Sequence, residues 1–222
     1  MSTLHLDPLD IAILEARNRP FSVPEPLERG AGVLLLALAS PVIAVSALTV
    51  AALSRRSPFI AHLRVGRHGV PFWVLKLRTL WPSTEESGSE SSWVVRVIAD
   101  PEVDGKLAAD PRITSRFAAF CRRHSIDELL QLWHVARGEM SLVGPRPLTR
   151  GEIVRYYRDH SAELLSVKPG LTGLWQVHGR SAIRFPRRAQ MDLQLVRTLS
   201  LRLYLKILAR TVPAVLRGRG AW

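Results

Sequence analysis

The hydrophobic and polar positions divide the chain into one uninterrupted apolar segment and a longer region of mixed pattern. Residues 30–53 contain no charged side chain and are bounded by Glu28 and Arg29 on one side and by Arg55 and Arg56 on the other. As a helix this segment would be about 36 Å long, enough to cross a hydrocarbon core of about 30 Å. Helices of soluble domains usually carry a polar stripe, so the segment predicts a membrane-inserted helix.

Ser40 and Pro41 lie near the centre of this apolar segment. Proline lacks the N–H that closes a helical turn and its ring clashes with the preceding turn, so we expect a kink there. The Ser40 hydroxyl can donate to a carbonyl that the proline leaves without a partner. A kinked span and a re-entrant hairpin both fit this pattern. Basic residues flank both ends, and cationic flanks prefer the cytoplasmic side, which favours the hairpin without deciding between the two.

The remainder of the chain alternates between strand-like and helix-like runs. Residues 59–65 and 70–80 are two strand-like runs around a turn bounded by Gly66 and Gly69, which predicts a β-hairpin. A polar, Ser- and Glu-rich loop follows at 82–92. The pattern turns helical from 115 to 137, with two apolar stripes, and further helices are predicted at 152–165 and 187–216. The last is basic and amphipathic, which suits either a bilayer surface or the surface of the domain itself.

The composition adds a strong positive charge to this picture. The 222 residues carry a formal net charge of +12, and from Arg180 onward nine Arg and Lys206 face Asp192 alone. Such an excess attracts nucleic acid, an anionic membrane surface or phosphorylated substrates. Cys121 is the single cysteine, and the seven His have no HxxH or HxxxH pair, which argues against a disulfide framework and a zinc hydrolase.

The residues that could carry chemistry start at Ser125. Ser125 and Glu128 have the spacing of a helix capping box, and in that interpretation Glu128 and the adjacent Asp127 are structural. A second interpretation, in which the acids act on a phosphorylated substrate, is supported by the cations in the flanking motifs, namely Arg122, Arg123, Arg146, Lys168 and Arg180. A carboxylate at a helix N-terminus among rigidly held cations would stay ionised, and the cations would neutralise a diphosphate within its reach. Asp127 could then form an acyl phosphate, and Mg²⁺ would lower the repulsion between carboxylate and phosphate.

Several motifs occur together in one order along the chain. They are the apolar segment with Ser40-Pro41, RVGRHGVPF (64–72), KLRTL (76–80), DPRIT (110–114), SIDELLQLW (125–133), RGEMSLVGPRP (137–147) and KPGLTGLWQVHGR (168–180). With these motifs the chain resembles the bacterial sugar transferases, the monotopic phosphoglycosyl transferases. The resemblance divides it into an N-terminal extension at 1–27, a membrane-inserted helix at 28–56 and a catalytic domain at 57–222.

The resemblance implies a mostly helical α/β monotopic membrane protein. Its apolar helix would be re-entrant and hinged at Ser40-Pro41. A compact catalytic domain with a small β-hairpin and amphipathic interfacial helices would lie on the cytoplasmic face of the bacterial inner membrane. Asp127 would attack the β-phosphate of a UDP-sugar, release UMP and pass the sugar phosphate to polyprenyl phosphate. Glu128 would be its partner in the dyad, and Asp127 would bind the Mg²⁺ cofactor.

The same resemblance matches Arg122 and Arg146 to the family's phosphate-handling arginines. Together with these two, the candidate phosphate-binding cations are Arg78, Lys168 and Arg180. The implied partners are a UDP-sugar, polyprenyl phosphate and anionic lipids of the inner leaflet, with a homo-oligomer left open. Leu130 stands where the family usually has Pro and His134 where Asn is common, which bears on substrate preference. Galactose, glucose and N-acetylated sugars all remain open.

Two other classes of function deserve comparison. A catalytically silent membrane adaptor of the same fold would keep the motifs without releasing UMP. A nucleic-acid binder is suggested only by the charge, and the apolar segment at 30–53 argues against it. A transferase with several membrane spans is excluded, because only one segment is long enough to enter the bilayer.

Overall fold

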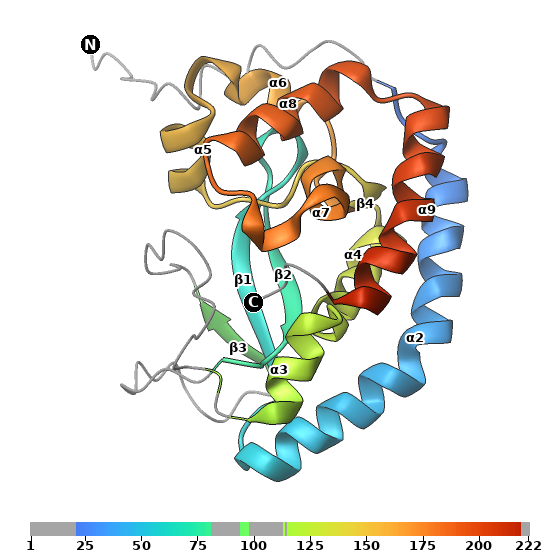
Figure 1. Cartoon of the computed structure of the whole chain (residues 1–222), viewed down its shortest axis with the longest axis vertical. Helices are drawn as coiled ribbons and strands as arrows, with labels where there is room; N and C mark the ends of the chain where they lie inside the picture. Colours follow the sequence, from blue (N-terminus) through green and yellow to red (C-terminus); the bar gives the residue numbers. More distant parts are fainter. Residues whose placement is uncertain (1–20, 81–93, 98–112, 114, 219–222) are drawn as a thin grey trace, which may run out of the picture.

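The computed structural model describes residues 21–80, 94–97, 113 and 115–218. These residues form a mostly helical α/β structure with two small sheets (Figure 1), as the sequence predicts. The predicted polar loop at 82–92 and, apart from Ile113, the DPRIT motif lie outside the described residues.

The apolar segment forms one long helix, α2 (Glu25–Ser54), of 30 residues. Among the described residues α2 alone has the length and composition to cross a membrane, with a mean hydropathy of 2.4 in its most apolar window. Pro41 lies inside the helix, and the Ser40 hydroxyl donates to the Ala37 carbonyl at 2.8 Å. That carbonyl would otherwise accept from residue 41, so the expected role of Ser40 is confirmed. Figure 1 shows α2 bending partway along its length, while its re-entrant path stays a prediction.

The predicted hairpin is confirmed at residues 59–77. Strands β1 (Phe59–Val65) and β2 (Pro71–Leu77) pair antiparallel, with Phe59 opposite Leu77 and Val65 opposite Pro71. The turn between them is the short helix η1 (Arg67–Gly69), in which His68 and Gly69 have positive φ. A third strand, β3 (Val94–Val97), runs parallel to β1, so the sheet order is β2-β1-β3.

The predicted helical stretch at 115–137 consists of separate helices, and the helices predicted at 152–165 and 187–216 are each broken, which corrects the continuity of those two. The observed helices are α3 (Arg116–Arg123), η2 (Ile126–Gln131), α4 (Leu132–Arg137), α5 (Arg150–Tyr156), η3 (Arg158–His160), α6 (Ser161–Leu165), α7 (Leu174–His178), η4 (Arg180–Ala182), α8 (Arg187–Thr198) and α9 (Leu201–Arg217). Ser125 and Arg158 break the first two with positive φ, which side chains other than Gly rarely adopt. Ser200 breaks the third, because its hydroxyl caps α9 by accepting from the Leu203 N–H.

The elements that follow the hairpin lie at its two ends and alongside it (Figure 1). Helices α5, α6, α7 and α8 lie around one end, and α3 lies at the other. A second sheet joins β4 (Ser141–Val143) to β5 (Gly170–Thr172) in parallel. The central hydrophobic cluster is built from α4, β4, α8 and α9, and its buried members are Leu132, Val135, Met140, Leu142, Val143, Leu195, Tyr204 and Ile207.

Both halves of α2 pack on this body. Near its start, Arg29 donates from Nε to the Ala136 carbonyl at 3.0 Å, and Gly32 lies directly against the Ala136 backbone. Near its end, Ala47 and Val50 belong to a cluster with Leu77 and Cys121. The opposite side of α2 exposes large apolar side chains, including Leu34, Leu38, Val45 and Leu48.

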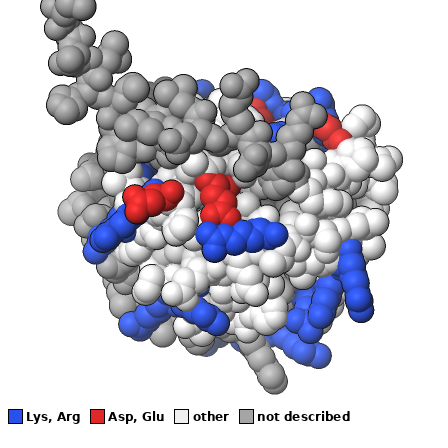
Figure 2. All heavy atoms as spheres, turned by 90° about the horizontal axis from the view of Figure 1, so that it is seen from above, with Lys and Arg blue, Asp and Glu red and all other residues white. Residues whose placement is uncertain are grey.

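The end of the molecule formed by α5, α6 and α8 carries mixed charge. Seen from this end, acidic side chains lie beside basic ones, while further basic side chains stand apart at the edge (Figure 2). One such pair joins Arg197 of α8 to Glu163 of α6 at 2.6 Å. This end therefore neutralises part of its charge internally, unlike the unpaired basic residues expected of a nucleic-acid surface.

Candidate active site

The dyad of Asp127 and Glu128 lies in η2, directly after the break at Ser125. The predicted capping box is wrong here. Ser125 adopts a left-handed conformation and its side chain caps no backbone N–H. Its hydroxyl instead accepts a hydrogen bond from the Arg180 guanidinium. Since the Glu128 side chain also turns away from the helix start, both acids are available for contacts other than capping.

Glu128 joins two cations that come from distant parts of the chain. Its Oε1 atom accepts from Lys76 Nζ at 3.2 Å and from Arg146 Nη1 at 3.3 Å. Lys76 comes from β2, and Arg146 follows β4 between two prolines. Burial lowers the pKa of Lys76, and the neighbouring Glu128 carboxylate opposes that shift. Because charge-assisted hydrogen bonds are the stronger kind, Glu128 fixes both cations beside Asp127.

Asp127 is only 7% exposed and lies in the field of these cations. It interacts electrostatically with Lys76 and with Arg180, and its charge helps to keep the pKa of each cation from falling further. Asp127 also acts on Cys121, whose pKa burial raises to about 11 with a further contribution from the Asp127 charge. A shielded carboxylate that interacts with cations suits an attacking group for an anionic substrate.

Arg180 connects the start of η2, which carries the dyad, to helix α9 by hydrogen bonds. Its guanidinium donates to the Arg123 carbonyl at 3.0 Å and to the Ala214 carbonyl of α9 at 3.4 Å, in addition to Ser125. Burial lowers its pKa, and Glu128 and Asp127 oppose the shift. The structure therefore brings Arg180 and Arg146 to the dyad, as the sequence predicts.

The three other predicted phosphate-binding cations are placed differently. Lys168 forms an ion pair with Glu25 at 3.4 Å, at the start of α2 and next to Gly138. Arg122 lies in the last turn of α3, and its Nε atom is buried without a hydrogen-bond partner among the described residues. Arg78 follows β2, where its backbone N–H donates to the Pro58 carbonyl at 2.7 Å. The structure does not bring Lys168 to the dyad, and phosphate binding by all three stays a prediction.

Sequence reasoning missed Lys76, although it quoted the KLRTL motif that contains it. The available signal was a charged residue inside an otherwise apolar strand, two positions before Arg78. Side chains two residues apart on a strand point to the same face, so the two cations could have been considered together.

Magnesium binding at the dyad stays a prediction. Among residues 21–80, 94–97, 113 and 115–218, no group of three or more His, Cys, Asp and Glu gathers to hold a metal ion. Mg²⁺ is often held by only one or two carboxylates together with substrate phosphates and water. Asp127 and Glu128, which are consecutive residues of η2, are the carboxylates available for such a site.

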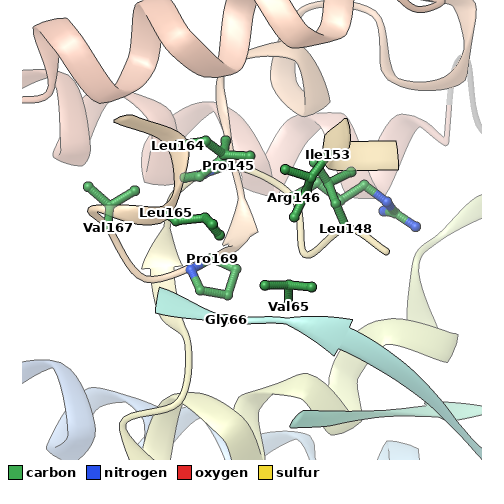
Figure 3. Close-up of a pocket in the computed structure, with 10 residues that line it drawn as sticks. All are labelled: Val65, Gly66, Pro145, Arg146, Leu148, Ile153, Leu164, Leu165, Val167 and Pro169. Atoms are coloured by element: carbon green, nitrogen blue, oxygen red, sulfur yellow. The ribbon is translucent and has the colours of Figure 1, made fainter. Parts of the chain in front are cut away.

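A small open cavity lies on the other side of the Arg146 loop (Figure 3). It is a shallow hollow open to solvent, and its lining is almost wholly apolar, with Val65, Leu148, Ile153 and Leu165 among its residues. The Arg146 guanidinium points away from it. Small-molecule sites are usually enclosed and contain a few precisely placed polar groups. This cavity is therefore not the candidate substrate site.

Comparison with known proteins agrees with this geometry. The family model described as "Bacterial sugar transferase" matches residues 25–218. The chain is 43% identical over 169 residues to a UDP-galactose-lipid carrier transferase from Erwinia amylovora, covering 75% of this chain and 35% of the relative. It is 42% identical over 164 residues to an undecaprenyl-phosphate galactose phosphotransferase from Salmonella typhimurium, covering 72% and 34%.

A further relative is matched over most of its length. This is a UDP-glucose:undecaprenyl-phosphate glucose-1-phosphate transferase from Caulobacter vibrioides, which is 34% identical over 223 residues, covering 97% of this chain and 75% of the relative. The chain thus spans about a third of the first two relatives and three quarters of this one.

Proposed function

The chain belongs to the bacterial sugar transferase family, and from this premise we propose that it transfers a sugar 1-phosphate from a UDP-sugar to undecaprenyl phosphate. The observation that carries the proposal is the dyad itself. Buried Asp127 lies beside Glu128, which binds Lys76 and Arg146, and Arg180 lies within electrostatic reach. The names of the relatives supply the two substrate classes, and the local chemistry supplies the mechanism.

Asp127 is the nucleophile of the first step. A carboxylate oxygen attacks the β-phosphorus of the UDP-sugar, and the bond from that phosphorus to the oxygen bridging the two phosphates breaks. UMP leaves with the bridging oxygen, and the sugar phosphate stays bonded to Asp127 as an acyl phosphate. In the second step a phosphate oxygen of undecaprenyl phosphate attacks the same phosphorus. The Asp127 carboxylate is restored, and undecaprenyl diphosphate-sugar is formed.

The surrounding cations serve both steps. Lys76, Arg146 and Arg180 offset the charge of the diphosphate, which would otherwise repel Asp127. Glu128 holds Lys76 and Arg146 in place through its hydrogen bonds to both. When bound by Asp127 and Glu128 together with the diphosphate, Mg²⁺ would supply further charge neutralisation.

The lipid substrate requires the site to lie at the membrane, and we assign the cytoplasmic face of the bacterial inner membrane. The two ends of α2 pack on the same catalytic body, at Ala136 and at Leu77, which supports a re-entrant rather than a spanning helix. The bend in α2 and the Ser40 hydrogen bond to Ala37 support the same path. Helix α9 exposes Leu201, Leu205, Val212 and Leu216 and carries basic residues that suit anionic lipids.

The test is UMP release by the full chain in detergent, with undecaprenyl phosphate and a panel of UDP-sugars. Asp127→Asn should lower turnover by more than about a thousand-fold because it removes the nucleophile. Asp159→Asn is the matched control, since Asp159 is an exposed acid in η3. Mass spectrometry should find a sugar-phosphate adduct on the peptide that contains Asp127.

Full turnover by Asp127→Asn, or product formation without an adduct, would contradict the mechanism. The absence of UMP release with every UDP-sugar would instead support the silent membrane adaptor. The same panel identifies the sugar, since the named relatives include both galactose and glucose transferases.

A further inference from the structure

A second buried acid lies outside the dyad. Asp192 of α8 is only 1% exposed, and Tyr157 donates its hydroxyl hydrogen to Oδ2 at 2.8 Å. The buried Trp175 indole N–H of α7 helps to hold down the pKa of this carboxyl, although neither Trp175 Nε1 nor Asp192 Oδ1 has a partner at hydrogen-bond geometry among the described residues. Burial of a carboxylate is costly unless opposite charges or hydrogen bonds compensate it. A residue that serves only to fill the core would be apolar, so Asp192 requires an explanation.

Two guanidinium groups lie against the same Trp175 ring. The Arg188 Cζ atom is 4.6 Å from the ring centroid, and the Arg146 Cζ atom is 6.0 Å from it. Arg188 is fixed further by hydrogen bonds to the carbonyls of Ile183 and Ser181. The two cations repel each other, and after burial the charge of Arg146 is the next cause that lowers the pKa of Arg188. The Asp192 charge opposes that shift and attracts both guanidinium groups.

One of these two cations reaches the dyad directly. Arg146 Nη1 donates to Glu128 Oε1 at 3.3 Å, while its guanidinium lies over Trp175. A continuous set of contacts therefore runs from Asp192 through Trp175 and Arg188 to Arg146 and on to Glu128. The negative charge at Asp192 attracts both guanidinium groups and so offsets the repulsion between Arg188 and Arg146. Removal of that charge would leave the repulsion without this offset. The guanidinium with the longer contact to the ring, Arg146, would then move away from the dyad.

We propose that Asp192 is a positioning residue whose buried carboxylate balances Arg188 and thereby holds the Arg146 guanidinium at the dyad. The inference rests on the proposed function, since Arg146 is assigned there to neutralise the diphosphate. A displacement of about 1 Å at a group that orients substrate can lower the rate about 100-fold, so a small shift of Arg146 is enough to be measured.

The test is kcat/KM for UMP release at pH 8.5 by the full chain. Asp192→Asn keeps the volume and an acceptor for Tyr157 but removes the charge, and it should lower kcat/KM at least about ten-fold. In an Arg146→Lys background the same change should cost less than about two-fold, because the group through which Asp192 acts is already altered. Tyr157→Phe, which keeps the charge, should stay within about three-fold of the parent chain.

The pH dependence of the activity distinguishes a positioning role of Asp192 from a purely structural one. Burial raises the pKa of Asp192 to about 7, while Tyr157, Trp175, Arg146 and Arg188 oppose the shift. Glu152 of α5 is the other acid that faces this group, through Arg188 and Tyr157. Asp192 is therefore mostly protonated at pH 6. The ratio of parent to Asp192→Asn activity should shrink between pH 8.5 and pH 6, whatever other groups titrate.

Three results would overturn the inference. They are unchanged activity of Asp192→Asn, an equal loss in the parent and Arg146→Lys backgrounds, and a loss in Tyr157→Phe as large as that in Asp192→Asn. Thermal unfolding of each variant establishes that it is folded. If the parent chain released no UMP, or Asp127→Asn retained full turnover, the proposed function would fail instead, so the two failures are distinguishable.

Discussion

The backbones of Gly144 and Gly170 approach each other closely where β4 and β5 meet. A Cβ atom on Gly170 would lie 2.0 Å from the Gly144 nitrogen and 2.5 Å from its Cα atom. Side-chain Cβ atoms essentially never come within 3.0 Å of another heavy atom, so Gly170→Ala must separate the two backbones by about 1 Å. Arg146 follows Gly144 by two residues, and the displacement therefore reaches the guanidinium that binds Glu128.

We expect two measurable results from Gly170→Ala. Over-packing of a tight core contact costs about 3 kcal/mol or more when only backbone can yield, which would appear as a lower Tm in detergent. Displacing Arg146 by about 1 Å should lower kcat/KM for UMP release about 100-fold. The matched control is Gly151→Ala in α5, where a Cβ atom meets nothing within 4 Å. That change should keep activity and add up to about 1 kcal/mol of stability.

Gly170→Ala and its control Gly151→Ala together test whether β4 and β5 approach too closely for a Cβ atom at position 170. Parent-like Tm and kcat/KM in Gly170→Ala would refute the reasoning, because no backbone shift would then be needed. Equal losses in Gly170→Ala and Gly151→Ala would refute it as well, since added bulk in open space has no steric cost. A loss of activity in Gly170→Ala without loss of stability would still fit, with the strands yielding at the Arg146 loop.

Two further predictions concern buried polar groups. Burial lowers the pKa of His134 below its usual 6.5, with Nε2 accepting from the Leu75 N–H at 3.0 Å and Nδ1 bonded to Glu139 at 2.6 Å. The unfolded chain therefore binds a proton that the folded chain does not, and stability should fall as the pH drops through about 6.5. Thermal unfolding from pH 7.5 to 5.5 measures this, and His134→Asn should flatten the dependence. Tyr204→Phe removes a hydrogen bond of 2.7 Å to the Glu28 carboxylate and should cost about 1–2 kcal/mol, seen as a lower Tm with little change in kcat/KM.

The sequence predicted correctly those structural elements that are determined by residues close together in the chain. The apolar segment at 30–53 became α2, and the turn bounded by Gly66 and Gly69 became the hairpin turn. The hydrogen bond from Ser40 to Ala37 also follows from neighbouring residues alone. In each case the decisive contacts join residues a few positions apart.

The contacts that build the site join residues far apart in the chain, and a single sequence does not reveal them. Glu128 binds Lys76 and Arg146, which lie 52 and 18 residues away. The spacing of Ser125 and Glu128 predicted a capping box. In the structure the Ser125 hydroxyl accepts from Arg180, so it does not cap the helix. Lys168 was predicted among the phosphate-binding cations, and in space it forms an ion pair with Glu25, which no local pattern indicates.

The buried carboxylate of Glu28 has a consequence for biosynthesis. Its Oε1 atom accepts from the Ser141 hydroxyl, the Leu142 N–H and the Tyr204 hydroxyl, the last of which is 176 residues downstream. At about 5–20 residues per second, translation places Tyr204 roughly 10–35 s after Glu28. Helix α2 is therefore synthesised well before the α9 donor to its Glu28 carboxylate exists. The carboxylate gains the Tyr204 hydrogen bond only after α9 has left the ribosome, so the contact between α2 and α9 is a late step of folding.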